Sequence, residues 1–470
     1  MAEIVSNQDT HQSFDVVDLV PESLPATEII TEEDAQYALD IVKRICTEVG
    51  PGLPGSPQER ERAELIKKEL EAHLGAENVA VEEFTLAPLA FHGVLRTSAL
   101  FTFIAALLNI SIGRILGVSP WLTNIASLVF AIFSALPVLF ETIMYREFVD
   151  QIFKQKQSVN LIGTMRKPGT EIIKRLIILS GHHDSVVEFI WLRILGGVKR
   201  LVKRGIHLDG AWEKNLLRIL TVIFVLITVT MFLGPITMLV ASLIQLSGII
   251  AVNAAIIRFG TLGWPLLAYP IVPSIIIGLS YIKIGKDGGI VPGAADNLSA
   301  SALAVALCRF LVKNPAYIPD HTEIRFISFG SEEAGLRGSR RYVARHLNEL
   351  KRLDARVLNF EIVTHPEIGI LTTDVTGLKN APDMVASVVA AAQRAGVPFK
   401  VNSNPTGGGG SDAGPFSEAG LKALTLMPFK MPEQMLDFYH QKWDTPEVLT
   451  IEPLLNVLKL TLEWVRCGGE

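Results

Sequence analysis

Long stretches without charged side chains constrain this 470-residue chain more than any other feature. Residues 97–140 contain a single charged side chain, and residues 219–257 and 259–282 contain none. A helix of about 20 apolar residues is long enough to cross a lipid bilayer. We therefore expect two α-helical membrane inserts, a transmembrane hairpin over 97–145 and a second insert over 187–284.

Each insert lies between parts of a soluble domain, so each must cross the membrane an even number of times, and two spans are expected in each. Pro120 should divide the first apolar stretch, and Gly234-Pro235 should break the second. The segment 186–202 contains three basic residues and is expected to lie at the membrane surface. Buried core helices are the alternative, which the uncharged length of these stretches disfavours.

The composition agrees with contact with lipid. Apolar residues make up 49% of the chain and charged residues 19%, against about 25% charged in a typical soluble protein. The net charge of −5 provides no basic surface for nucleic acid, which is not an expected partner. The three cysteines, Cys46, Cys308 and Cys467, are too few and too widely spaced for a disulfide framework or a cysteine-based zinc site, and they fit a reducing compartment.

Outside the inserts, strand patterns alternate with helix patterns. Residues 1–30 are acidic, lack the pattern of a signal peptide and are expected to be a flexible tail. The segments 31–96, 146–186 and 285–470 are expected to build one α/β domain with a mixed, mainly parallel sheet flanked by helices. Strands are predicted near 79–84, 159–164, 176–180, 323–329, 356–362, 368–372 and 421–427, and helices near 31–50, 56–74, 297–312, 338–348, 382–395 and 451–466.

Side chains that can bind metal follow several of these strands, where α/β sheets place their ligands. Residues two apart share one face of an extended segment, so His182 can bind a metal while Asp184 holds its second ring nitrogen. His183 should face the opposite way. Asp296 precedes a predicted helix, a position at which a lone carboxylate would ordinarily be an N-cap.

Two adjacent acids, Glu332 and Glu333, follow the strand predicted near 323–329. Like charges at a strand end are costly unless a cation lies between them or one is neutral. Because neighbours on a strand project to opposite faces, one of these acids can ligate a metal while the other acts as a base. Glu361 ends another predicted strand and His440 lies in a loop; taken alone, each could be an ordinary edge or surface residue.

Taken together, these positions offer two imidazoles and three carboxylates. That set is sufficient for two zinc ions if Asp296 bridges them. The five expected metal ligands are His182, Asp296, Glu333, Glu361 and His440.

The motifs around these residues resemble those of the M28 family of zinc peptidases, relatives of bacterial leucyl aminopeptidases. The matching stretches are 50–56, 181–185, 293–297, 331–339, 410–412, 415–416 and 439–440. The resemblance implies one zinc on His182, Asp296 and Glu361 and a second on Asp296, Glu333 and His440. It also implies that Glu332 is the general base.

The chain departs from the family pattern in three ways. Glu361 stands where the family usually has Asp, and Ala413 follows Asp412 where the family usually has His. His182 and Asp296 are also far apart in the chain, because the second membrane insert lies between them. Both inserts fall outside the resemblance.

The activity that the resemblance implies is aminopeptidase, with peptides as substrates. The apolar inserts make the lipid bilayer the second expected partner. One alternative is a glutaminyl cyclase, which resembles these peptidases but uses one zinc to close an N-terminal ring, and the five-ligand set disfavours it. Another is a membrane receptor or transporter subunit with a peptidase-like domain, for which loss of ligands would be expected. The preferred peptide and the oligomeric state stay open.

Basic residues gather at those ends of the predicted spans that adjoin the catalytic domain, whereas the far-side turns contain little beyond Arg114. Cytoplasmic loops are enriched in Lys and Arg. We therefore expect a multi-pass membrane protein whose catalytic domain and both termini are cytoplasmic.

Overall fold

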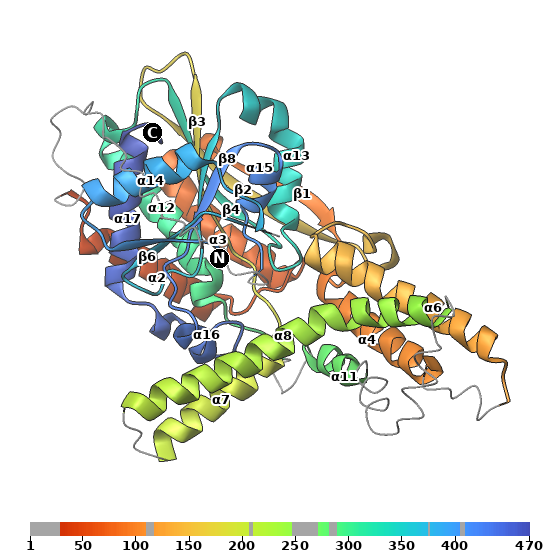
Figure 1. Cartoon of the computed structure of the whole chain (residues 1–470). Coiled ribbons are helices and arrows are strands. Elements are labelled where there is room, and N and C mark those ends of the chain that lie inside the picture. Colours follow the sequence, from red (N-terminus) through yellow and green to blue (C-terminus); the bar gives the residue numbers. More distant parts are fainter. Residues whose placement is uncertain are drawn as a thin grey trace, which may run out of the picture.

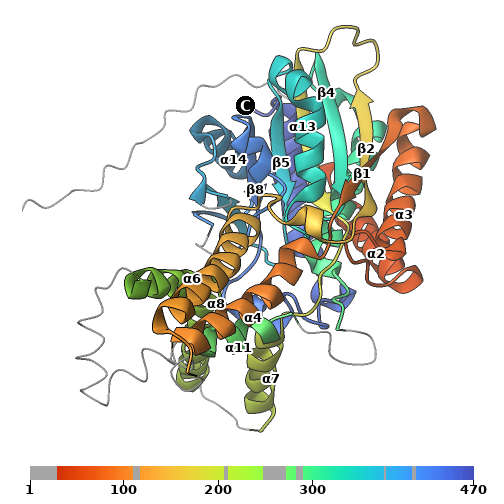
Figure 2. The same cartoon turned by 90° about the vertical axis from the view of Figure 1, so that its right-hand side faces the viewer.

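The computed structural model describes residues 29–109, 117–205, 210–246, 271–281, 289–374, 377–404 and 409–470. Within these ranges an eight-stranded sheet lies between two layers of helices, and a group of long helices projects from one end (Figures 1 and 2). Residues 29 and 30 are the only part of the predicted tail that is described. Residues 206–209, 247–270 and 282–284 of the second insert also lie outside the described residues.

The sheet has the strand order β1-β2-β4-β3-β5-β8-β6-β7. Its centre, β4-β3-β5-β8, is parallel; β1 and β2 add antiparallel strands at one edge, and β6 runs antiparallel to β8. The predicted mixed, mainly parallel sheet is thus confirmed, with one additional edge strand, β7. The strands are β1 (Val79–Leu86), β2 (Lys156–Arg166), β3 (Arg175–His182), β4 (Thr322–Phe329), β5 (Arg356–Phe360), β6 (Ile368–Leu371), β7 (Phe399–Asn402) and β8 (Lys422–Leu426).

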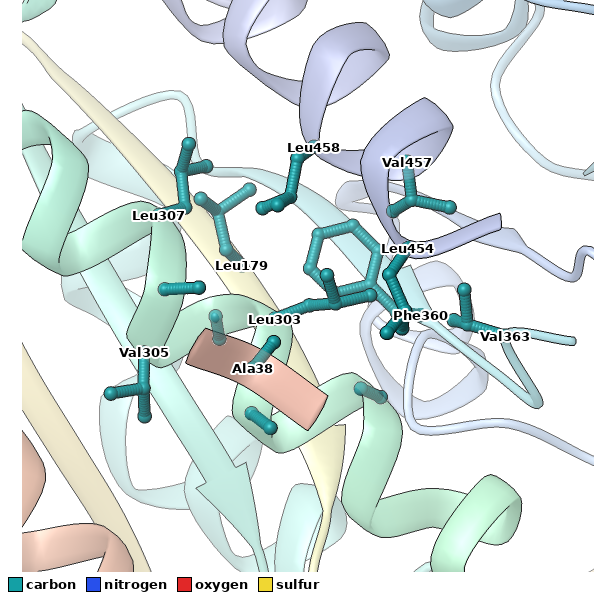
Figure 3. Packing of buried hydrophobic residues seen from close by; sticks show 14 of the residues in the cluster. Ala38, Leu179, Leu303, Val305, Leu307, Phe360, Val363, Leu454, Val457 and Leu458 are labelled. Atoms are coloured by element: carbon teal, nitrogen blue, oxygen red, sulfur yellow. The ribbon is translucent and has the colours of Figure 1, made fainter. Parts of the chain in front are cut away.

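Helices cover both faces of the sheet. On one face, Leu303 of α12, Ala38 of α2 and Leu454 of α17 pack against Leu179 of β3 and Phe360 of β5 (Figure 3). This face is covered by α2 (Glu32–Glu48), α3 (Pro57–Leu74), α12 (Ser299–Lys313), α14 (Pro382–Arg394) and α17 (Ile451–Arg466). The other face is covered by α13 (Arg337–Arg352) and α15 (Gly414–Glu418).

The first insert forms the two helices that its apolar pattern predicts, α4 (Ala90–Asn109) and α6 (Pro120–Pro137), and ends in a π-helical turn, η2 (Val138–Ile143). Hydroxyl groups join the two helices. Ser98 donates to the Ser134 carbonyl at 3.0 Å, and the Thr102 and Ser134 hydroxyls lie 2.6 Å apart. Such bonds between helices hold membrane bundles together where the surroundings provide no hydrophobic drive.

The second insert contains α7 (Ile190–Gly205), α8 (Gly210–Leu246) and α11 (Ile271–Leu279). The predicted break at Gly234-Pro235 is wrong, because α8 continues through Pro235. Proline removes one backbone donor from a helix, but side-chain hydroxyls and neighbouring helices can compensate for this in apolar surroundings. The Thr237 hydroxyl donates to the Gly234 carbonyl at 2.9 Å, next to the proline.

Four helical stretches among the described residues are long and apolar enough to cross a membrane: Ala90–Leu108, Trp121–Ile143, Trp212–Leu243 and Ala294–Lys313. The last of these contains α12, which is buried in the core of the catalytic domain. The third exposes large apolar side chains along its length, as a helix in contact with lipid would. These include Ile219, Val222, Val225, Leu226, Val229, Leu233, Val240 and Leu243.

A buried charge network attaches the first insert to the catalytic domain. The Arg337 guanidinium, at the start of α13, pairs with Glu141 of η2 and with Asp150 at 3.1 Å. All three side chains are almost completely buried. The second oxygen of Glu141 accepts the backbone N–H groups of Phe148 and Val149. The chain that leaves the hairpin is therefore held against α13.

Replacing Arg337 by Met should lower the free energy of unfolding by about 3–5 kcal/mol, because the change leaves two buried carboxylates without their cation. Thermal unfolding of the detergent-solubilised protein, followed by circular dichroism, measures the loss.

The matched control is Arg345→Met on the same helix. Arg345 pairs with Glu82 at 2.8 Å, but 46% of its side chain is exposed. An exposed pair of this kind contributes at most about 1 kcal/mol. Equal losses in the two variants would contradict a stabilising role for the buried network.

Candidate metal centre

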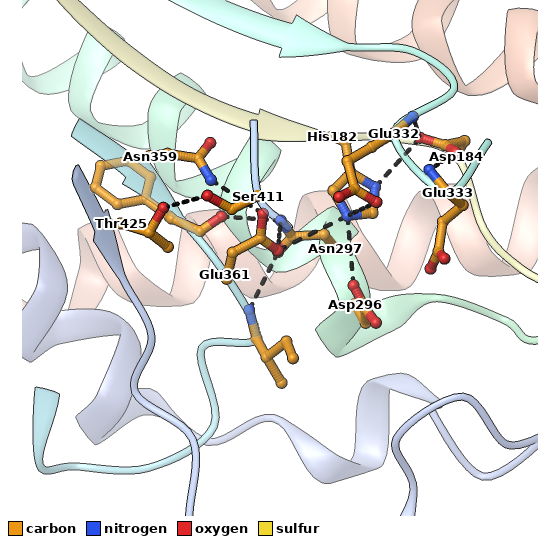
Figure 4. A network of polar contacts seen from close by, with 12 residues as sticks. His182, Asp184, Asp296, Asn297, Glu332, Glu333, Asn359, Glu361, Ser411 and Thr425 are labelled. Carbon is orange, nitrogen blue, oxygen red and sulfur yellow. Dashed lines mark hydrogen bonds and ion pairs between the residues drawn. The ribbon is translucent and has the colours of Figure 1, made fainter. Parts of the chain in front are cut away.

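The predicted metal-binding side chains lie together near the carboxyl ends of the central strands. Figure 4 shows this group apart from His440. His182 is the last residue of β3, and Glu361 directly follows β5. Glu332 and Glu333 occupy the turn after β4, and Asp296 precedes α12. His440 follows the short helix α16 (Glu433–Asp437). Segments far apart in the chain thus meet in one place.

These side chains form two groups that share Asp296. In the first, Nε2 of His182 lies 3.4 Å from Oδ1 of Asp296 and 3.8 Å from Oε2 of Glu361. In the second, Nε2 of His440 lies 3.2 Å from Oδ2 of Asp296 and 3.4 Å from Oε1 of Glu333. The two oxygens of Asp296 therefore face different imidazoles.

The donor spacing fits zinc. Ligand atoms at about 2.0–2.1 Å from a tetrahedral zinc ion are about 3.3–3.4 Å apart. Three of the four separations lie within about 0.2 Å of that range, and the His182–Glu361 separation of 3.8 Å is somewhat longer. Imidazole and carboxylate are also ligand types that zinc accepts. The residues present can therefore hold metal in both groups.

Residues 281–465 match the sequence profile of peptidase family M28. This part of the chain is therefore similar to an M28 peptidase domain. Over 181 residues it is 31% identical to aminopeptidase YwaD of Bacillus subtilis (strain 168), a match that covers 37% of this chain and 34% of the relative. The match thus spans about a third of that curated relative.

Among solved structures, the chain is similar to the zinc aminopeptidase BSAP of Bacillus subtilis, with a TM-score of 0.49, 15% identity and coverage of 92% of this chain and 94% of that one. It is similar to the same degree to Fimbriiglobus ruber glutaminyl cyclase, with a TM-score of 0.49, 14% identity and the same coverage. The resemblance predicted from the motifs is confirmed at the level of the family.

The candidate metal centre concentrates negative charge away from water. Burial, with smaller contributions from neighbouring carboxylates, raises the pKa values of Glu332 and Glu361 well above their usual range. Burial disfavours a charged His440, but Glu333 and Asp296 outweigh it and raise the pKa of this imidazole to about 10. Buried carboxylates grouped in this way are unfavourable without additional positive charge. Bound cations would supply it.

The two adjacent acids are separated by a turn. We expected them to diverge because neighbours on a strand project oppositely, but β4 ends at Phe329, so that reason is wrong. The chain turns at Ser331, whose φ of +56° lies in the left-handed region. Glu332 then lies 3.6 Å from Nε2 of His182, whereas Glu333 points to His440.

Asp184 holds this turn in place. Its two oxygens accept the backbone N–H groups of Glu332 and Glu333, each at 3.0 Å. Oδ1 also lies 3.2 Å from Nδ1 of His182, which leaves Nε2 facing the carboxylates. The predicted position of Asp184 behind His182 is what the structure has. The neighbouring His183 faces away, with Nδ1 2.8 Å from the hydroxyl of Ser328.

Asp444 holds the backbone of the shared ligand, Asp296, in the same way. This role was not predicted. Its oxygens accept the N–H groups of Ala295 at 2.7 Å and Asp296 at 3.1 Å, and the side chain is fully buried. It lies only four positions after His440, and this closeness in sequence was the available signal.

Two further residues without a predicted role hold Glu361. The side-chain amide of Asn297 donates to Oε2 at 2.6 Å, and that of Asn359 donates to Oε1 at 3.0 Å. Both asparagines are fully buried. Both oxygens of Glu361 are therefore held by buried side-chain amides. Ala413, the other departure from the family pattern, is fully buried in the apolar cluster under α13.

Replacing Asp444 by Asn should weaken metal binding by about 10–100-fold, as changes behind a metal ligand commonly do. The substitution places an NH2 group against a backbone N–H donor and so displaces the segment of Asp296. Competition with a chelator of known affinity measures the change. Asp383→Asn, whose side chain is 59% exposed at the start of α14, is the control and should bind metal as the wild type does. Unchanged affinity in Asp444→Asn would contradict this role.

Proposed function

We propose that the chain is a membrane-anchored dinuclear zinc exopeptidase that removes N-terminal residues from peptides. The observation that carries the proposal is the position of Asp296, whose two oxygens face His182 and His440 at 3.4 and 3.2 Å. One zinc would be held by His182, Asp296 and Glu361, and the second by Asp296, Glu333 and His440. When bound, such ions activate water and polarise a carbonyl group.

Glu332 is proposed as the general base. It lies beside both groups without belonging to either, and 12% of its side chain is exposed, so that a substrate can reach it. Burial holds the pKa of its carboxyl above the usual range, which favours accepting a proton. In this role Glu332 takes the proton of the attacking water and passes it to the leaving amine. Asp184 keeps the base in place through its bond to the Glu332 backbone.

A one-zinc glutaminyl cyclase is the alternative activity. Against it stands the second ligand group, in which Asp296, Glu333 and His440 are all present and face one another. The same observation disfavours a receptor or transporter subunit without catalysis, because such a subunit would not need both ligand groups.

Metal analysis of the wild type should give about two zinc ions per chain. Glu332→Gln should keep both ions and lose most of its turnover, because only the proton acceptor is removed. Glu333→Gln should lose affinity for one ion, because it removes a ligand. Zinc content and kcat of the three proteins, measured side by side, check this.

Two results would contradict the assignment. A tightly bound stoichiometry near one that stays unchanged in Asp296→Ala would exclude a bridged pair of ions. If the two glutamine variants behaved alike in both zinc content and rate, the division between base and ligand would be wrong.

Acetylation of the substrate's N-terminal amine should abolish turnover, because an aminopeptidase acts only on a free N-terminus. Hydrolysis of paired peptides with free and acetylated N-termini, followed by mass spectrometry, measures this. Equal rates would reject exopeptidase activity, and the loss of ammonia from an N-terminal glutamine with every peptide bond intact would favour the cyclase.

The catalytic domain is proposed to be cytoplasmic. Arg96, Arg146 and Lys199 lie at those ends of the inserts that adjoin the domain, which the positive-inside rule assigns to the cytoplasm. Single cysteines near Asn404 and near Gly117 test this in intact cells. An impermeant reagent should label the second site, and labelling of only the first would reverse the orientation.

A further inference from the structure

The amphipathic helix α7 is bound to the catalytic domain through its basic side chains. Lys199 donates to the Glu433 carbonyl at 2.9 Å and pairs with Asp437 at 2.7 Å. The Arg200 guanidinium lies over the Trp443 ring, 3.3 Å from its centre. These partners flank His440 in the sequence, so α7 is attached to the segment that provides a ligand of the metal centre.

The opposite side of α7 is apolar and exposed. Ile194, Val198 and Leu201 are 48%, 39% and 71% exposed and are spaced four and three residues apart, so they lie on one helix face. The neighbouring helix α8 exposes apolar side chains along its length. A basic amphipathic helix beside a membrane span is typical of one that lies in the bilayer surface. The lipid bilayer is therefore the partner that fits this face.

Aromatic rings from both inserts connect α8 to the surroundings of the metal centre. Phe224 of α8 lies 6.2 Å from Phe189, which lies 5.1 Å from Tyr281. Tyr281 lies 4.2 Å from His92 at the start of α4. The His92 ring contacts that of Phe91, and Phe91 lies 5.0 Å from Tyr145 at the end of the first insert. These rings form an aromatic row.

This aromatic row contacts the segments that build the centre. The backbone N–H of Phe189 donates to the His440 carbonyl at 3.0 Å, and the Tyr145 hydroxyl accepts the N–H of Gly410 at 2.8 Å. The Phe91 ring packs so closely on Gly335, two residues after Glu333, that a Cβ there would lie 2.8 Å from it. Burial, followed by the charge of Glu332, raises the pKa of Tyr145, as expected for a phenol beside that carboxylate.

His92, Tyr145 and Tyr281 are partly exposed, so a substrate can contact them. We propose that the enzyme acts on peptides bound to the bilayer surface through an apolar or acylated segment, whose free N-terminus reaches the metal centre along this aromatic row. The inference rests on the proposed exopeptidase function and specifies its substrate class.

The test uses the full chain in phosphatidylcholine vesicles and two peptides with the same N-terminal sequence. One peptide ends in a palmitoylated lysine and binds the vesicles, and the other ends in an acetylated lysine and stays in solution. The wild type should cleave the anchored peptide with a kcat/KM about tenfold or more above that of the soluble one, because the apolar face keeps the centre at the surface where that peptide collects.

The anchored peptide could also be cleaved faster only because the vesicle surface concentrates it, so a variant is needed. Ile194→Glu/Leu201→Glu, which removes the apolar face of α7, should lower the ratio of the two kcat/KM values several-fold. Ile172→Glu is the matched control: Ile172 is 63% exposed in the loop before β3, at the end of that strand opposite to His182, and the ratio should stay unchanged.

A wild-type ratio near one, or a ratio equally high in the α7 variant, would overturn the inference. Binding of both peptides to Glu332→Gln protein in the same vesicles gives the comparison without turnover. Preferential binding of the anchored peptide without hydrolysis by the wild type would count against the peptidase function alone, and equal binding would overturn the inference itself.

Discussion

Mutual repulsion among buried carboxylates is the constraint that the architecture around Asp296 has to satisfy. The carboxylates of Asp296, Glu333 and Glu361 belong to the two ligand groups, and that of Glu332 lies 3.6 Å from Nε2 of His182. His182 and His440 are the neighbouring side chains that can carry positive charge. Burial of like charges is unfavourable unless donors or cations compensate for it. The amides of Asn297 and Asn359 and the backbone donors fixed by Asp184 and Asp444 hold the acids in position. The ligands are preorganised at a cost in stability that bound metal would offset.

The α/β domain can accept the two apolar inserts because each insert leaves and re-enters the domain at one point. The first replaces the turn of the β1-β2 hairpin, where Leu86 pairs with Lys156. The second is closed by an antiparallel bridge between Val187 and Ile290. Since the entropy of closing a loop rises slowly with its length, long insertions at such points cost the fold little. The inserts therefore need not disturb the sheet that carries His182 and Glu361.

Local patterns predicted much of this structure. The helix predicted near 56–74 is α3, at whose start the Ser56 hydroxyl accepts the Glu59 N–H at 3.2 Å. This helix and the ligand types at strand ends depend on neighbouring residues and could be predicted from the sequence. The edge strand β7 could not, because its Phe-Lys-Val-Asn sequence has no clear pattern and depends on pairing with β6. Nor could the pairing of Arg337 with Glu141, since nothing in either segment identifies the other. Interactions between distant segments could not be predicted from the sequence.

The two ligand groups differ in what supports them. His182 and Glu361 stand at the ends of β3 and β5, two adjacent parallel strands in the middle of the sheet. Glu333 and His440 lie on loops, and each loop contacts one of the two inserts. The first loop does so through Arg337 and its buried partners, the second through α7 and the bond from Phe189 to the His440 carbonyl. The rigid sheet thus fixes one group, whereas the inserts fix the other. The inserts therefore also support the candidate metal centre, because they contact the loops that hold Glu333 and His440.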